Sequence, residues 1–127
     1  MGLKLKTYRL GTHRGKDEGI RIGAVRFLPR GVKKEDYSKL NYFDVWFPTV
    51  SPGKEAIKDF KGDKKSRERF KKRYRKEMDG NADARHAVKL LSEVAKKTSI
   101  AIGCYCEDES LCHRSILKKL IEKEAPR

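Results

Sequence analysis

The sequence predicts an α/β fold, a single layered domain over residues 1–127 in which helices pack on a mixed sheet. Three observations support this class. The N-terminal part contains three short extended segments, the middle contains three helical patterns, and a buried strand followed directly by a helix closes the chain. The last strand and helix are the clearest βα unit, and helices layered on a sheet are the best fit to the whole pattern. No low-complexity linker interrupts the 127 residues, which is the size of one domain.

Three segments in the N-terminal part are predicted to be strands. Leucine and threonine alternate with lysine in residues 3–10, the two-residue period of a strand with one buried face. Residues 20–28 are mostly apolar and run into a Pro-Arg-Gly turn. Residues 41–50 are rich in aromatic and β-branched side chains, which favour strands. The polar segment 11–19, punctuated by glycine, is expected to be a loop.

Three helices are predicted after the strands. The first begins at Ser51, because serine suits the N-cap and the following proline suits the first helical position. The second begins near Ser66 and repeats an apolar or aromatic residue every fourth position, at Phe70, Tyr74 and Met78. Asn81 caps the third, whose apolar residues form one stripe over 84–95.

A strand and a helix close the chain. Residues 99–106 form an apolar run without alternation, as expected of a parallel strand buried on both faces. Residues 111–124 form an amphipathic helix whose N-cap is predicted to be Asp108 or Ser110.

The charge of the chain points to an anionic partner. A formal net charge of +14 attracts polyanions, so nucleic acid or a phosphorylated small molecule is the expected partner. No apolar run approaches the roughly 18 residues of a membrane span, and no signal peptide is evident, so a cytoplasmic protein without a membrane partner is expected. The absence of glutamine and the high Lys, Arg and Glu content are typical of thermophile proteins. No cofactor and no oligomeric state follow from the sequence.

Residues 61–76 are the most basic segment of the chain. They contain ten lysines and arginines and two acidic residues. A helix of this composition can lie along a phosphate backbone and bind it with little sequence preference. It can equally be a solvated helix face, which is what most charge runs are.

Two arginines, Arg26 and Arg30, follow the second predicted strand. The ends of strands carry ligands in α/β sheets, and arginine makes paired hydrogen bonds with phosphate or carboxylate. The alternative is an ion-paired turn.

The segment "CYCEDESLCHRS" (104–115) contains all three cysteines. Cys104, Cys106, Cys112 and His113 have the chemistry of zinc ligands, but the spacing differs from the usual pair of cysteines two to four residues apart. Alternatively, Cys112 lies in the first turn of a helix, where the helix dipole favours a thiolate. His113 would then be an acid or a base and Arg114 a positive neighbour. The third alternative is a half-buried cysteine beside a capping histidine.

Four stretches in this order resemble the family called domain of unknown function 488 (DUF488), particularly its YeaO-like branch. They are "RFLPRGVKK" (26–34), the Ser-Pro pair at 51–52, "FKKRYRKE" (70–77) and "CHRSIL" (112–117). The resemblance covers the chain from Ile20 onward and implies a compact prokaryotic α/β domain without an established biochemical role. The positions that match the family are Arg26, Pro29, Arg30, Gly31, Arg73, Tyr74, Glu77, Cys112, His113 and Arg114.

The chain departs from the family pattern at three of its positions. It has Val25 where the branch usually has aspartate and Leu28 where it usually has tryptophan. Many short members have asparagine in place of Cys112. The resemblance therefore implies that His113, rather than the cysteine, carries any shared chemistry.

These observations lead to one principal hypothesis and two alternatives. The principal hypothesis is an enzyme that acts on a phosphorylated or nucleic-acid ligand in a basic pocket at the strand ends. His113, with Cys112, would be catalytic, and the anion would be bound by Arg26, Arg30, Arg73, Arg114 and Tyr74. The first alternative is a non-catalytic nucleic-acid-binding protein that uses residues 61–76. The second is a small zinc protein with Cys104, Cys106, Cys112 and His113 as ligands.

Overall fold

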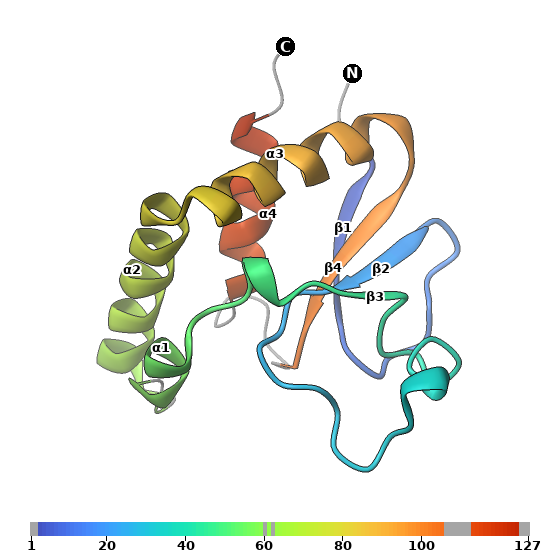
Figure 1. Cartoon of the computed structure of the whole chain (residues 1–127), viewed down its shortest axis with the longest axis horizontal. Helices are drawn as coiled ribbons and strands as arrows, with labels where there is room; N and C mark the ends of the chain where they lie inside the picture. Colours follow the sequence, from blue (N-terminus) through green and yellow to red (C-terminus); the bar gives the residue numbers. More distant parts are fainter. Residues whose placement is uncertain (1–2, 60, 62, 106–112, 125–127) are drawn as a thin grey trace.

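The computed structural model describes residues 3–59, 61, 63–105 and 113–124. In these residues a four-stranded sheet packs against α-helices (Figure 1). The strands are β1 (Leu5–Arg9), β2 (Ile20–Gly23), β3 (Val45–Trp46) and β4 (Ile100–Cys104). The helices are α1 (Lys54–Asp59), α2 (Lys64–Gly80), α3 (Ala82–Lys97) and α4 (His113–Glu124), with 3₁₀ turns η1 (Lys34–Asp36) and η2 (Pro48–Val50). Within this part of the chain no helix is long and apolar enough to cross a bilayer.

The sheet has the strand order β1-β4-β2-β3, and each of its three pairings is parallel. The predicted α/β layered class is confirmed, but the sheet is parallel where a mixed sheet was expected. The difference lies in residues 10–19. This segment does not reverse the chain as a hairpin would; it returns to the starting end of β1, so that β2 runs in the same direction and β4 fits between them.

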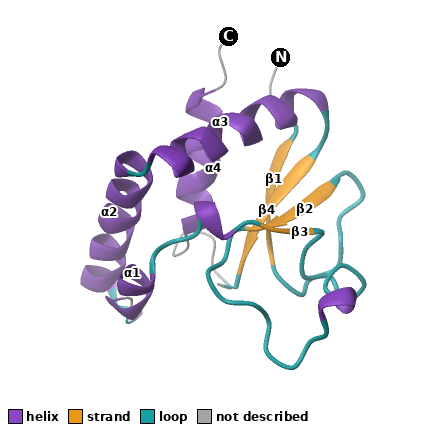
Figure 2. Cartoon of the chain, in the orientation of Figure 1, coloured by secondary structure: helices purple, strands orange, loops and turns teal. Residues whose placement is uncertain are grey.

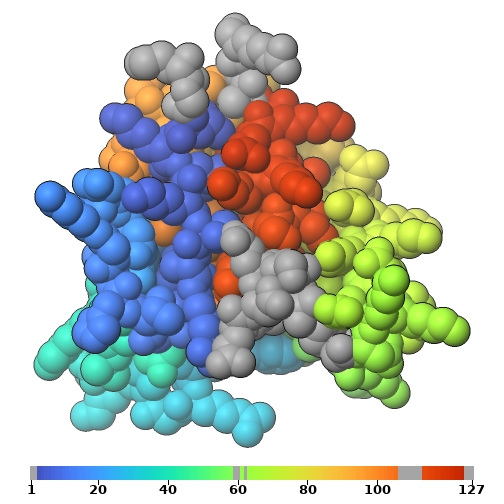
Figure 3. All heavy atoms as spheres, turned by 180° about the vertical axis from the view of Figure 1, so that it is seen from behind, coloured from blue at the N-terminus to red at the C-terminus, as the bar shows by residue number. Residues whose placement is uncertain are grey.

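The helices cover one face of the sheet and form the larger core (Figure 2). Alternate residues of the central strands, Ile100 and Ile102 of β4 and Ile22 of β2, point to this face and are buried. The view from behind shows α4 beside β1, with α2 on the far side of α4 (Figure 3). The helical side chains of this core include Tyr74, Met78, Val88, Leu91, Leu117 and Ile121.

The opposite face is covered by loop residues, and glycine occupies two positions of its strands. A Cβ atom at Gly103 would lie 2.3 Å from Cζ of Tyr8, and one at Gly23 would lie 2.4 Å from Cδ2 of Phe43. The two aromatic rings therefore rest directly on the backbone of β4 and β2, where a larger residue would collide with them. Leu10, Val25, Ala101 and Cys104 complete this smaller core.

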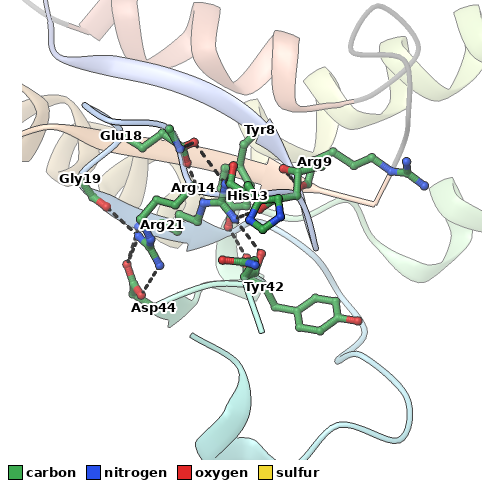
Figure 4. Close-up of polar contacts among 12 residues, drawn as sticks. Tyr8, Arg9, His13, Arg14, Glu18, Gly19, Arg21, Tyr42 and Asp44 are labelled. Carbon is green, nitrogen blue, oxygen red and sulfur yellow. Dashed lines mark hydrogen bonds and ion pairs between the residues drawn. The ribbon is translucent and has the colours of Figure 1, made fainter. Parts of the chain in front are cut away.

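A buried arginine fastens the loops to this face (Figure 4). Arg21 is 0% exposed, and its guanidinium lies 4.1 Å from the centre of the Tyr8 ring. It donates to both carboxylate oxygens of Glu18, at 2.6 and 3.2 Å. It also donates to three backbone oxygens, those of Thr12, His13 and Asn41. Since a buried charge is tolerated only when it is paired and hydrogen-bonded, these contacts hold the 10–19 and 37–44 loops in place.

An exposed ion pair extends this cluster toward β3 (Figure 4). Arg14 binds Asp44 through two hydrogen bonds of 2.9 Å, and the backbone N–H of Arg21 donates to the same carboxylate. Burial acts to raise the pKa of Asp44, but the hydrogen bonds from Arg14, Arg21 and Ser38 outweigh it and lower that pKa to about 2. For the same kind of reason the pKa of Glu18 is lowered: hydrogen bonds from Arg21 and Gly15 outweigh its burial.

The strands are shorter than the patterns predicted, most clearly in the segment 41–50. Only Val45 and Trp46 pair with β2 there. Phe43 turns onto Gly23, and Asp44 is held by Arg14, so the residues before β3 serve the loop face instead of the sheet. After β3 the η2 turn begins at Pro48, which ends the strand.

The helix starts differ from the predicted ones in two of three cases. α1 begins at Lys54, because the hydroxyl of Ser51 donates to the carbonyl of Pro48 and closes η2. The N-cap of α2 is Asp63, whose carboxylate accepts from the N–H of Ser66 at 2.7 Å. The cap of α3 is confirmed, since the side-chain oxygen of Asn81 accepts from the N–H of Ala84 at 3.2 Å. Asp108 and Ser110 lie outside the described residues.

Candidate functional site

A cavity of about 360 Å³ lies between the segments that follow β2 and β3 and the junction of α2 with α3. Its walls include Arg26, which follows β2, Ser51 and Gly53, which follow β3, and Lys76 and Glu77 of α2. The volume is within the range of small-molecule sites, roughly 300–1,000 Å³. The carboxyl ends of parallel strands are also where α/β proteins bind their ligands. This cavity is the candidate site.

The polar side chains of the cavity are held in place by the loop after β3. Nε of Arg26 donates to the carbonyl oxygen of Pro52 at 3.3 Å. The N–H of Gly53 donates to Oε1 of Glu77 at 2.9 Å, which fixes the carboxylate at the wall. A Cβ atom at Gly53 would lie 2.8 Å from Oε2 of Glu77, so glycine allows this close approach. The cavity therefore combines two cations with one oriented carboxylate.

Tyr74 is the residue of α2 that anchors η2 below the cavity. Its side chain is 0% exposed, and its hydroxyl donates to the carbonyl oxygen of Val50 at 2.7 Å. Burial, with a smaller contribution from the charge of Glu77, raises the pKa of Tyr74. Tyr74 was predicted to bind the anion; its hydroxyl instead contacts the backbone beside Ser51.

His113 makes the corresponding contact with the segment after β2. It is 5% exposed, and its Nε2 lies 2.5 Å from the carbonyl oxygen of Ala24. The ring meets Tyr74 edge-on, with 5.2 Å between ring centres. Burial lowers the pKa of His113 to about 4; the hydrogen bond to Ala24 opposes this shift and the charge of Arg114 adds to it. At neutral pH the ring is therefore uncharged, and Nε2–H donates to Ala24.

Arg114 packs at the end of β4, in the interior. It is 5% exposed, and one of its terminal nitrogens donates to Sγ of Cys104 at 3.3 Å. Cys104 is 1% exposed and is disulfide-bonded. Arg114 is not among the described residues that line the cavity.

Cys106 and Cys112 lie outside the described residues, so the hypotheses of a Cys112 nucleophile and of a zinc site remain predictions. Among the residues that the structure does describe, no three His, Cys, Asp or Glu side chains are grouped to hold a metal ion. Metal analysis of the purified protein tests the zinc hypothesis directly.

Arg30 and Arg73 are both exposed to solvent. Arg30 precedes Gly31, whose φ of 72° makes the turn after β2, and Arg73 precedes Tyr74 on α2. Neither belongs to the described lining of the cavity, so Arg26 is the one predicted anion-binding residue that the structure places there.

Sequence reasoning placed Lys76 only in the basic segment 61–76, and it gave Glu77 no role beyond a match to the family pattern. The helical period of α2 could have identified Glu77 as a neighbour of Tyr74. Glu77 follows the buried Tyr74 by three positions and therefore lies on nearly the same side of α2.

Comparison with known proteins yields one match. The family model described as "Active DUF488-N3 subclade" (DUF488-N3a) matches residues 5–125. Searches of curated proteins and of solved structures found no match. Because the family model spans nearly the whole chain, including every strand and helix described above, the chain belongs to the DUF488 family, within the DUF488-N3 group.

Proposed function

We propose that the chain is an enzyme that acts on a phosphorylated ligand, a nucleotide or a nucleic acid, bound in the Arg26–Glu77 cavity. The observation that carries the proposal is the fixed carboxylate of Glu77 in a cavity that also contains Arg26 and Lys76. A general acid or base beside two cations is the arrangement needed to bind an anionic group and move a proton near it. The family description contains the word "active", which accords with an enzyme.

Arg26 and Lys76 would bind the anionic group. Within the described part of the chain, the side chain of Arg26 donates a hydrogen bond through Nε, and the terminal nitrogens would bind the ligand. Two such nitrogens match two oxygens of a phosphate. Lys76 would add a second, mobile charge.

Glu77 would carry the proton. Oε1 accepts the N–H of Gly53, and this contact holds the carboxylate in one orientation. Glu77 lines the cavity, and Oε2 would accept a proton from an attacking water or hydroxyl group. His113 and Tyr74 would act as positioning residues, because they hold the Ala24 and Val50 ends of the two segments that form the walls.

The experiment compares three variants with the wild-type chain. Binding of inorganic phosphate and of mononucleotides is measured by calorimetry, and turnover by a screen for release of phosphate or base. Arg26→Gln should weaken binding, whereas Glu77→Gln should keep binding and reduce turnover by roughly a hundredfold or more. Lys89→Gln, on the exposed side of α3, removes the same charge as Arg26→Gln and should change neither. Equal binding by Arg26→Gln and Lys89→Gln would contradict the proposal.

A second candidate function, non-catalytic nucleic-acid binding through α2, is favoured by the orientation of this helix. Phe70, Tyr74 and Met78 are buried, so the basic residues point outward. The exposed cations include Lys64, Lys65, Arg69, Lys72, Arg73 and Arg75. The double variant Lys65→Gln/Lys72→Gln should weaken binding of a DNA duplex and lower the salt dependence of binding by about two charges. Salt-independent binding would exclude this function.

A further inference from the structure

A second cavity, also of about 360 Å³, lies on the loop face of the sheet. It is bounded by Trp46 of β3, by Leu28 of the segment after β2, and by Tyr37 and Phe43 of the loop before β3. These are aromatic or apolar side chains, and two of them remain open to solvent. Trp46 and Leu28 are each 40% exposed. We call this space the aromatic cavity.

The aromatic walls are held rigidly. The indole N–H of Trp46 donates to the carbonyl oxygen of Val25 at 2.7 Å, which fixes the ring against the end of β2. The rings of Tyr37 and Phe43 pack with 4.9 Å between their centres, and Phe43 rests on Gly23. An exposed aromatic ring that is already oriented loses little side-chain entropy when a flat ligand stacks on it.

The polar groups of the aromatic cavity suit a flat ring with hydrogen-bonding edges. Lys34 is a donor there, and Ser38, whose hydroxyl donates to Asp44, can accept. Glu35 contributes acceptors, whereas the two oxygens of the Asp44 carboxylate already accept hydrogen bonds from Arg14, from the N–H of Arg21 and from Ser38. A nucleobase has both amino donors and carbonyl acceptors on its edges, so it can use both kinds of group.

Cations border the aromatic cavity. Arg30, Lys33 and Lys39 are exposed on the adjoining loops, in addition to Lys34 in the lining. Aromatic side chains next to a track of positive charge are the usual construction of sites for single-stranded nucleic acid. A formal net charge of +14 strengthens the attraction for such a polymer.

The two cavities are close neighbours along the chain. Arg26 lines the first and Leu28 lines the second, and two residues span at most about 7 Å of backbone. Trp46, the last residue of β3, also lines the second cavity, and Thr49, three positions later, lines the first. A ligand with a phosphate at Arg26 and an adjacent base at Leu28 would therefore contact both.

We propose that the aromatic cavity binds an unpaired nucleobase, stacked on Trp46 and Leu28, and that the ligand of this protein is single-stranded nucleic acid. The inference deepens the proposed function and rests on it only for the phosphate at Arg26. A paired base within a duplex is stacked on both sides and cannot enter, so duplex nucleic acid should bind without contacting Trp46.

The single tryptophan of the chain makes the test direct, because all indole fluorescence comes from Trp46. A single-stranded oligothymidylate should quench this fluorescence, whereas an abasic strand of the same length and a duplex should not. Leu28→Asn should weaken the quenching titration by roughly tenfold, because it removes an apolar side chain that the bound base would cover. Leu90→Asn, on α3 and also exposed, is the matched control and should bind as the wild type does. Trp46→Phe, followed by the anisotropy of a labelled strand, should bind more weakly than wild type.

Two outcomes would overturn the inference: equal affinity of Leu28→Asn and Leu90→Asn, or equal quenching by the abasic strand. Its failure can be distinguished from failure of the proposed function. If the oligothymidylate quenches Trp46 in Glu77→Gln, but the wild-type chain turns over no nucleotide or strand, the aromatic cavity is supported and the enzyme is contradicted. If instead the protein turns over nucleotides, Leu28→Asn leaves that turnover unchanged and no strand quenches Trp46, the enzyme is supported and the aromatic cavity is contradicted.

Discussion

The hydroxyl of Tyr74 donates a hydrogen bond of 2.7 Å to the carbonyl oxygen of Val50, and both residues are 0% exposed. This contact joins α2 to the turn after β3. Tyr74→Phe keeps the ring but leaves the Val50 carbonyl without that donor, so we expect a loss of about 1–3 kcal/mol in the free energy of unfolding. Urea denaturation measures it. Tyr105→Phe is the control: its hydroxyl also donates to a carbonyl, that of Phe27, but at the surface, and its loss should be smaller. Equal losses would contradict this account.

Arg21→Met should be among the most destabilising single changes in the chain. It leaves the Glu18 carboxylate and several loop carbonyls without the buried guanidinium, and breaking a buried pair typically costs about 3–5 kcal/mol. Arg14→Met removes an ion pair in which the Arg14 side chain is 33% exposed, and should cost about 1 kcal/mol or less. Thermal unfolding of the two variants compares them. A smaller loss for Arg21→Met than for Arg14→Met would show that Arg21 does not hold the loops.

Alanine should have opposite effects at two glycines. At Gly103 a Cβ would lie 2.3 Å from Tyr8, whose ring is tethered by a hydrogen bond to the Tyr42 carbonyl, so Gly103→Ala should destabilise the fold by about 1–3 kcal/mol. At Gly80, in the last turn of α2, a Cβ meets nothing within 4 Å. Gly80→Ala should stabilise the chain by up to about 1 kcal/mol, because alanine favours helix. Denaturant midpoints of both variants give the signs, and a neutral Gly103→Ala would refute the close approach.

Stability should fall as the pH drops below about 6.5. Burial lowers the pKa of His113 from 6.5 to about 4 in the folded chain, so between these values the unfolded chain binds a proton that the folded chain does not. Unfolding is therefore favoured progressively as the pH falls through this window, by about 3 kcal/mol in all, and the full stability is present above it. Unfolding free energies at pH 7 and pH 5 measure the slope. His113→Asn should flatten it and the exposed His86→Asn should not; an unchanged slope in His113→Asn would assign the effect to other groups.

The elements that local pattern determines were predictable, and those that distant contacts determine were not. The four-residue repeat of Phe70, Tyr74 and Met78 identified the buried side of α2, and the unbroken apolar run identified β4 as a central strand. Arg21 gave no such signal. An arginine in a short strand normally faces solvent, and its burial depends on carbonyls contributed by two loops, one of them 20 residues away.

The same distinction applies to the candidate site. Arg26 follows a strand in the sequence and lines the cavity in the structure, while its binding of an anion stays a prediction. His113 and Tyr74 matched a family pattern, but their polar atoms contact backbone oxygens, which a pattern of residue types does not reveal. Glu77 is a candidate because the N–H of Gly53 donates a hydrogen bond to its carboxylate, and this contact joins residues that are 24 positions apart in the sequence.

The brevity of β3 has a consequence for how this protein behaves at high concentration. Only Val45 and Trp46 form the edge of the sheet there, with side chains 48% and 40% exposed. A long apolar edge of this kind would recruit strands from other molecules. Two residues offer too few backbone groups for such pairing, and the lysine-rich loops beside them repel a second copy. The chain can therefore display an indole ring to solvent without the aggregation that an exposed hydrophobic edge usually brings.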